Sequence, residues 1–349
     1  MNQIPEIDAA LLTKFLVDLL KTPSPTGFAH EAIALTDHVF HNLPGIKCRR
    51  LPKGGLMVTV PGEKTDAPRG LTAHADTLGA MVKAVKPNGR LQITRIGGVA
   101  WNTVETEGCT VYTREGKRIR GSILITAASI HVFGDKLADT PRKEENMEVR
   151  LDERVNSADE TRALGISVGD FVSFDPRVEL TNGFVRSRHL DDKACVACLV
   201  EAVRALTSAG VKPTQTCYIY INNYEEVGLF AAADFPTPIT ELLAVDMAAV
   251  GEGQTSDEYH TTICVKDSGG PYHHGFNQRL RNLGDQYKID YKVDIYPTYS
   301  SDASAYWRAG GNMPIALIGP GIDASHNYER THTDALVDTT RWLLAYMVN

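Results

Sequence analysis

Apolar positions in the first 76 residues follow a helical spacing first and a strand spacing afterwards. Residues 8–21 predict an amphipathic helix, and a second predicted helix follows a Ser-Pro-Thr-Gly turn and runs to about Asn42. The short apolar runs 57–60 and 70–76 are bounded by Pro-Gly or polar residues, which is typical of strands in a sheet covered on both faces. This part of the chain therefore predicts an α/β domain.

Between residues 78 and 185 the pattern changes to short alternating segments with frequent glycine, which predicts a β-rich region. The charged stretch 135–155 is expected to be an exposed loop. Ser157 and Glu160 have the spacing of a capping box at the start of a short helix. A β-rich insertion into the α/β domain is the simplest explanation.

The α/β pattern returns after residue 186. It predicts helix 191–208 ended by Gly210, strand 216–223, helix 227–233, strands 242–248 and 314–319, and a terminal helix through TTRWLLAYMV. We expect three segments: residues 1–77 and 186–349 as the two parts of one α/β domain, and residues 78–185 as the insert.

Charge and hydropathy exclude several classes of protein. Lysine and arginine total 36 against 43 acidic residues, and no basic stripe follows the chain, so nucleic acid is not an expected partner. No apolar run reaches the ~20 residues that span a bilayer, and acids interrupt the first helix, unlike a signal peptide. We expect a cytoplasmic protein without a membrane partner.

Cysteines are too sparse for a disulfide scaffold. The chain has six of them, as expected in a reducing compartment. Cys195 and Cys198 are separated like a redox pair, but they fall in an apolar helical run that places both on one helix face. Packing is therefore favoured over redox chemistry for this pair.

Acidic and imidazole groups recur where predicted strands end or helices begin, the edge at which α/β sheets bind ligands. Each alone is typical of a helix cap or a surface residue. Together they offer the carboxylate and imidazole ligands that two divalent metal ions require, with a carboxylate left over for proton transfer. The residues are His74, Asp76, Asp191, Glu225, Glu226, Asp246 and His332.

Two local motifs sharpen this hypothesis. Side chains of consecutive residues diverge, so that in the Glu225-Glu226 pair one carboxylate can bind metal while the other reaches the attacking water. Asp76, two residues after His74, can accept the second ring N–H of that imidazole and orient it.

The chain resembles the glutamyl aminopeptidase and tetrahedral aminopeptidase family of co-catalytic metallopeptidases. The resemblance covers nearly the whole chain and rests on AHADTLGAMV, SADETRALGISVGDFVSF, VRSRHLDDKACVACLVEA, NNYEEVGLFAA, AVDMA, SSDASAY and SHNYERTH. It implies a three-layer αβα catalytic domain with an inserted, barrel-like dimerisation domain. It also implies that dimers assemble into a hollow tetrahedral dodecamer that admits unfolded peptides.

The resemblance further implies residue roles. One ion would be held by His74, Asp191 and Asp246, and the other by Asp191, Glu226 and His332, with Asp191 bridging. Glu225 would be the base that takes a proton from the attacking water and delivers it to the leaving amine, and Asp76 would orient His74. Zinc is the expected metal, with cobalt or manganese as alternatives.

The sequence departs from the family in ways that affect the substrate. Thr77-Leu78-Gly79 replaces Glu-Ile-Gly, and Cys195 replaces a glycine, although the ligand set remains complete. HADTLG and SRHLDDKA also resemble a branch linked to the N-acetylglutaminylglutamine amide osmoprotectant, which implies a small-peptide substrate. His326, six residues before His332, is the alternative last ligand.

Two other functions remain open at this stage. A di-metal deacylase or carboxypeptidase would use the same ions but would need a binding arginine, and the spacing identifies none. A scaffold without catalysis would tolerate loss of the base or of several ligands, and all are present.

Overall fold

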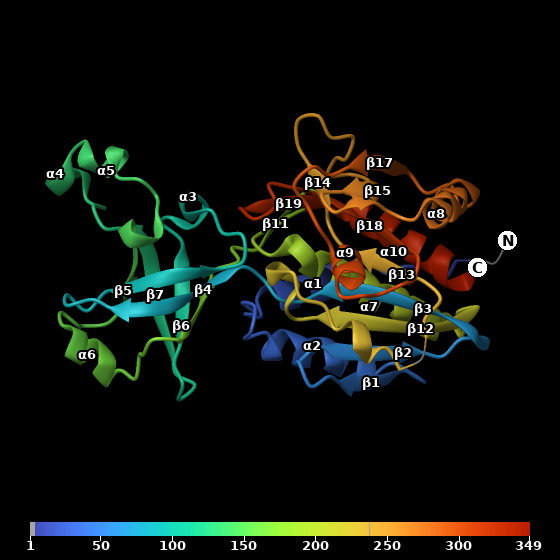
Figure 1. Cartoon of the computed structure of the whole chain (residues 1–349), viewed down its shortest axis with the longest axis horizontal. Helices are drawn as coiled ribbons and strands as arrows, with labels where there is room; N and C mark the ends of the chain where they lie inside the picture. The colour runs from blue at the N-terminus through green and yellow to red at the C-terminus, as the bar shows by residue number, and fades with distance from the viewer. Residues whose placement is uncertain (1–3, 237) are drawn as a thin grey trace. The chain divides into compact units, whose positions relative to one another are not determined.

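The structure, a computed structural model, describes residues 4–236 and 238–349 in two compact units. One unit comprises the chain up to Asp76 and from Arg177 onward, and the other comprises Thr77–Pro176 (Figure 1). The sequence placed the second boundary at 185. The chain returns to the first unit earlier because β10 (Glu179–Thr181) pairs with β11 (Phe184–Ser187), which in turn pairs with β19 (Glu329–His332).

The first unit is built on a mixed sheet of thirteen strands among the described residues. Parallel pairing joins β12 to β3, β3 to β13 and β13 to β18, so these strands end at the same edge of the sheet. The strands of the main path are β1 (Lys47–Arg50), β2 (Leu56–Val60), β12 (Gln215–Asn222), β3 (Lys64–His74), β13 (Leu242–Val245), β18 (Ile315–Asp323), β19, β11 and β10 (Glu179–Thr181). The others are β14 (Ala248–Val250), β15 (Thr261–Asp267), β16 (Gly270–Pro271) and β17 (Tyr291–Ile295).

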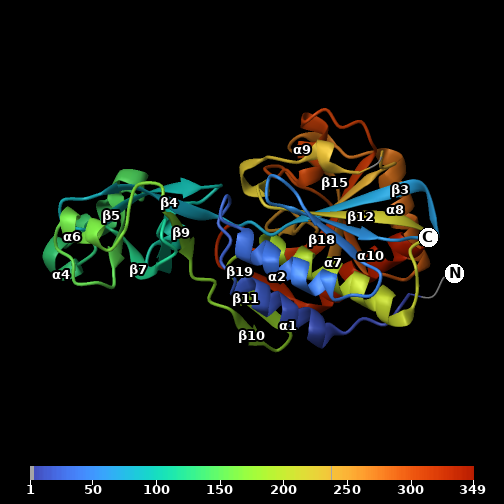
Figure 2. The same ribbon diagram turned by 90° about the horizontal axis from the view of Figure 1, so that it is seen from below.

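Both faces of this sheet are apolar, and helices cover both. On β13, Leu243 and Val245 belong to the core on one face, while Leu242 and Ala244 belong to the core on the other. Figure 2 shows α9 on the side opposite to α1 and α2. The helices are α1 (Ala9–Leu20), α2 (His30–His41), α7 (Leu190–Ala209), α8 (His274–Gln286), α9 (Asp302–Arg308) and α10 (Thr333–Val348). The predicted α/β class is confirmed.

The predicted helix 227–233 is wrong. Two short 3-10 turns stand in this region, η2 (Glu225–Val227) and η3 (Ala232–Asp234). Gly228 adopts a left-handed conformation, with φ of 75°, which ends the first turn after Val227. The apolar composition of the segment had favoured one continuous helix.

The second unit is a closed barrel of β4 (Gly79–Val85), β5 (Leu91–Ile96), β8 (Met147–Leu151), β7 (Arg118–Ile125), β6 (Gly108–Tyr112) and β9 (Phe171–Phe174). It has its own apolar core. Its helices are α3 (Trp101–Val104), α4 (Ile130–Phe133), α5 (Lys136–Asp139), η1 (Glu144–Asn146) and α6 (Ala158–Ala163), and α6 begins with the predicted capping box. The β-rich insert is thus confirmed.

The stretch 135–155 is not entirely an exposed loop, because it contains β8. Met147, Val149 and Leu151 are buried and alternate with other residues along this strand. The alternation was hidden from sequence analysis by the charges on either side. None of the helices in the described ranges combines the length and the apolar character needed to cross a membrane.

Candidate functional site

The carboxyl edge of the parallel strands collects the predicted acid and imidazole groups. Asn222 on β12 lies opposite His74 on β3, so the chain that follows β12 emerges beside that histidine. The groups come from the ends of neighbouring elements: His74 from the end of β3, Glu225 and Glu226 from η2, Asp246 from directly after β13, Asp191 from the first turn of α7, and His326 from the turn after β18. Sheet topology therefore brings together residues that are far apart in the sequence.

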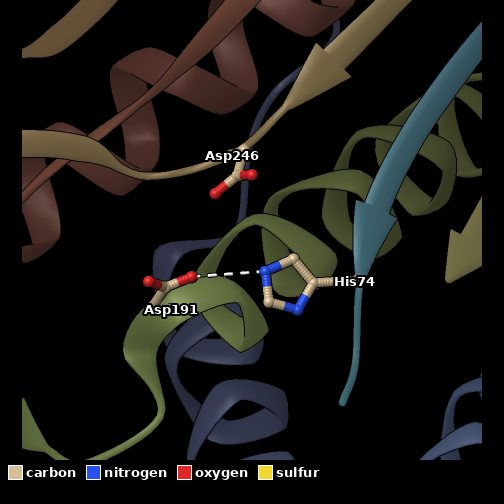
Figure 3. A group of neighbouring side chains, drawn as sticks. All are labelled: His74, Asp191 and Asp246. Carbon is tan, nitrogen blue, oxygen red and sulfur yellow. Dashed lines mark ion pairs between the residues drawn. The ribbon is translucent and has the colours of Figure 1, made fainter. Parts of the chain in front are cut away.

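His74, Asp191 and Asp246 form the first of two side-chain groups (Figure 3). The His74 Nε2 atom lies 3.2 Å from the Asp191 Oδ1 atom. One nitrogen and two carboxylate oxygens of this group lie within 4.8 Å of one another, and all three residues are buried. We refer to them as the first trio.

Asp191, Glu226 and His326 form the second trio, with ligand atoms within the same 4.8 Å. The His326 Nε2 atom lies 3.4 Å from Glu226 Oε2 and 3.6 Å from Asp191 Oδ2. Asp191 thus turns one oxygen towards His74 and the other towards His326. This is the arrangement expected of a carboxylate shared by two cations.

His332 is not part of either trio. Its ring caps α10, where it accepts a hydrogen bond from the Asp334 amide at 3.2 Å, and it packs against the Phe184 ring. The reason is the direction of β19, which runs antiparallel to β18 and so leads away from the edge where the parallel strands end. His326 lies in the connecting turn and stays at that edge.

Asp76 orients two parts of the site. The His74 Nδ1 atom is 3.0 Å from the Asp76 main-chain carbonyl and 3.6 Å from its carboxylate, so the carbonyl is the closer partner. The Asp76 carboxylate accepts hydrogen bonds from the Thr26 hydroxyl, at 2.7 Å, and from the amides of Glu225 and Glu226. Asp76 therefore also holds the backbone of the Glu-Glu pair.

Glu225 stands outside both trios but beside the first. Its Oε2 atom lies 3.7 Å from His74 Nε2. Burial and the nearby Asp246 charge raise the pKa of Glu225 well above its usual value, although His74 acts in the opposite direction. Glu225 also lines a cavity of about 530 Å³ together with Asp191, Glu226, Asp246 and His326, a volume suited to a small ligand.

The pKa shifts in this cluster reflect crowded and buried negative charge. Burial raises the pKa of Asp246 to about 8 and raises that of Glu226. Burial alone would lower the pKa of His74, but Asp191 and Asp76 outweigh it and raise that pKa well above the usual value. Crowded carboxylates take up protons when no cation compensates their charge. The donor set, one imidazole and two carboxylates in each trio, suits divalent transition metals.

Glu329 is a further residue of the site that the sequence analysis did not single out. Its buried carboxylate accepts hydrogen bonds from the amides of Asp191 and His326, both at 3.1 Å. It therefore ties together the backbones of two members of the second trio. A carboxylate three residues after a histidine was the only signal in the sequence, and that signal is too common to be specific.

Cys195 and Cys198 are both buried within α7 with free thiols. Burial raises the pKa of Cys198 to about 12, and its thiol donates to the Leu336 carbonyl. A thiol that stays protonated is a poor nucleophile. These properties agree with the packing role favoured for the pair.

Comparisons with known proteins agree with this geometry. The family described as M42 glutamyl aminopeptidase matches residues 54–341. The Bacillus subtilis protein YhfE is 47% identical over 335 residues, 96% of each chain. A TET aminopeptidase from a Thaumarchaeota archaeon has the same fold, with a TM-score of 0.87 at 16% identity over 97% of each chain.

A Pyrococcus horikoshii TET1 peptidase, which can assemble into a tetrahedron or a large octahedral shell, also shares the fold. Its TM-score is 0.83 at 19% identity, over 97% of this chain and 99% of that chain. At this identity the likeness concerns the fold alone. The family match and the identity to YhfE are stronger evidence of family membership, since each spans most of the chain. The chain therefore belongs to the M42 glutamyl aminopeptidase family.

Proposed function

We propose that the chain is a metal-dependent aminopeptidase that hydrolyses the N-terminal peptide bond of peptides, with Glu225 as general base. Membership of a peptidase family supports the reaction class. The observation that carries the proposal is the position of Asp191, whose two oxygens face His74 and His326 at 3.2 and 3.6 Å. One carboxylate between two imidazoles supports a site for two cations.

Two divalent ions would be held by the trios, one by His74, Asp191 and Asp246 and the other by Asp191, Glu226 and His326. His326 takes the place that the sequence analysis gave to His332, because it lies with Asp191 and Glu226. Zinc is the proposed metal, with cobalt or manganese as alternatives. Such ions polarise the scissile carbonyl and lower the pKa of water.

We assign the proton transfer to Glu225. It reaches the cavity next to the first trio without belonging to it, and the Asp76 carboxylate holds its backbone amide at 3.1 Å. We propose that the Glu225 carboxylate accepts a proton from the attacking water and passes it to the leaving amine. Asp76 acts as a positioning residue for Glu225 and for His74.

The cavity lining favours an aminopeptidase over a carboxypeptidase or a deacylase of N-acylated dipeptides. Recognition of a substrate carboxylate calls for a buried cation, usually an arginine. Among the described residues that line the cavity there is no arginine or lysine, while four carboxylates are present. The described lining therefore offers no side-chain partner for a substrate carboxylate, and a substrate with a free N-terminal amine needs none.

An assay of blocked and unblocked peptides tests the proposal. The metal-loaded protein should release the first residue of Leu-Gly-Gly and leave N-acetyl-Leu-Gly-Gly intact. Removal of metal with a chelator should abolish the release, and addition of zinc, cobalt or manganese should restore it, because the ions supply the carbonyl polarisation. Cleavage confined to the acetylated peptide would establish the deacylase alternative, and full activity after verified metal removal would refute metal dependence.

We further propose that the barrel unit joins two copies of the chain and that dimers build a dodecamer in the cytoplasm. The fold shared with the shell-forming Pyrococcus horikoshii TET1 peptidase supports an assembly of this kind. Closed symmetric assembly is the usual state of soluble oligomers.

A further inference from the structure

The cavity at the site is lined by both charged and neutral residues. The charged lining residues are the carboxylates and His326 described above. The lining also includes Ala249 and Val250 from β14 and Pro297 and Thr298 from the segment after β17; we call these four residues the neutral wall. The wall combines aliphatic surface with one hydroxyl and carries no charge.

A peptide bound for N-terminal cleavage places its amine and its first side chain in different surroundings. The amine and the scissile carbonyl both have to lie beside the proposed ions and Glu225, because the bond is cleaved there. The rest of the lining, which includes the neutral wall, is left for the first side chain.

Charged side chains find no partner on this wall. On this wall a glutamate side chain would lose its hydration without gaining a counter-charge, since the described lining residues include no arginine or lysine. A lysine side chain needs an acid, but every acidic residue among the described lining residues belongs to a trio or is Glu225. An apolar side chain needs no charged partner, and it can bury apolar surface against Val250 and Pro297.

We propose that the enzyme removes N-terminal residues with neutral, mainly apolar side chains and discriminates against glutamate and lysine. This selectivity rests on the aminopeptidase function proposed above. It contrasts with the preference for glutamate that the family description names. We assign specificity mainly to Val250, because it lines the cavity and is held in place by the strand β14.

A panel of aminoacyl-p-nitroanilides tests the selectivity on the metal-loaded, full-length protein. The kcat/KM values for leucine and methionine substrates should exceed those for glutamate and lysine by at least ~10-fold, the discrimination that a hydrophobic pocket typically gives. Free leucine should likewise inhibit more strongly than free glutamate.

Two variants at Val250 locate the effect. Val250→Lys introduces a cation and should raise the glutamate-to-leucine ratio of kcat/KM by roughly 10-fold, since each ~1.4 kcal/mol of added pairing is a factor of ten. Val250→Met is the matched control of similar length without charge, and its ratio should stay near that of the wild type.

The outcomes separate this inference from the function on which it rests. Wild-type preference for glutamate or lysine, or equal rates for all substrates, would overturn the selectivity while leaving aminopeptidase activity established. Hydrolysis of none of the substrates by metal-loaded protein would overturn the proposed function and the selectivity with it. If Val250→Lys does not fold, the wild-type substrate panel and the inhibition by leucine and glutamate still test the selectivity.

Discussion

Glu225→Gln is expected to lower kcat by roughly 10²–10⁴-fold, the contribution typical of general acid–base catalysis, while the metal content stays unchanged. Glutamine keeps the size of the side chain but cannot accept the proton of the attacking water. Glu225 lies outside both trios, so its replacement removes no proposed ligand. Steady-state kinetics on Leu-Gly-Gly and elemental analysis of the purified variant measure the two effects.

Glu226→Gln is the matched control, because the two glutamates are neighbours and only Glu226 belongs to a trio. It should lose part of the bound metal as well as activity. Wild-type kcat in the Glu225 variant would refute its role as the base. Equal metal loss in both variants would show that Glu225 serves as a ligand instead.

His326→Ala is expected to weaken metal binding by more than ~10–100-fold. A loss of that size is typical when a residue that only orients a ligand is removed, and His326 is itself a proposed ligand. The reason is that His326 supplies the only imidazole of the second trio. His332→Ala should keep the metal and its affinity. It should instead cost about 0.5–2 kcal/mol of stability, the usual effect of losing a helix cap, because His332 caps α10.

Isothermal titration of the metal-free variants with zinc, together with denaturant unfolding, compares the two histidines directly. Wild-type zinc affinity in His326→Ala combined with lost affinity in His332→Ala would restore the assignment made from the sequence.

Much of the site follows from one rule that can be applied to the sequence. His74 ends β3, Asp246 directly follows β13, and the Glu225-Glu226 pair follows β12 closely; parallel strands end at a common edge. The same rule favours His326, which follows β18 closely, over His332, which ends the antiparallel strand β19. The prediction of His332 gave motif matching more weight than this rule, whereas the structure brings His326 together with Asp191 and Glu226.

The other differences arise from contacts that a sequence does not display. Glu329 joins the backbones of Asp191 and His326 across 138 and 3 residues of chain, which no local pattern reveals. In the sequence, Gly228 does not visibly interrupt the apolar segment. In the structure, its left-handed conformation divides that segment. β8 is recognisable only once β7 and β5 lie beside it.

Anomalous X-ray scattering at the zinc edge, from crystals of the zinc-loaded protein, tests the two-metal site most directly. The expected result is two peaks per chain, ~3.5–4 Å apart, each with ligands at ~2.0–2.2 Å. One peak should contact His74 and Asp246, the other Glu226 and His326, and both should contact Asp191. A single peak, or a second peak bound by His332, would contradict the proposed site.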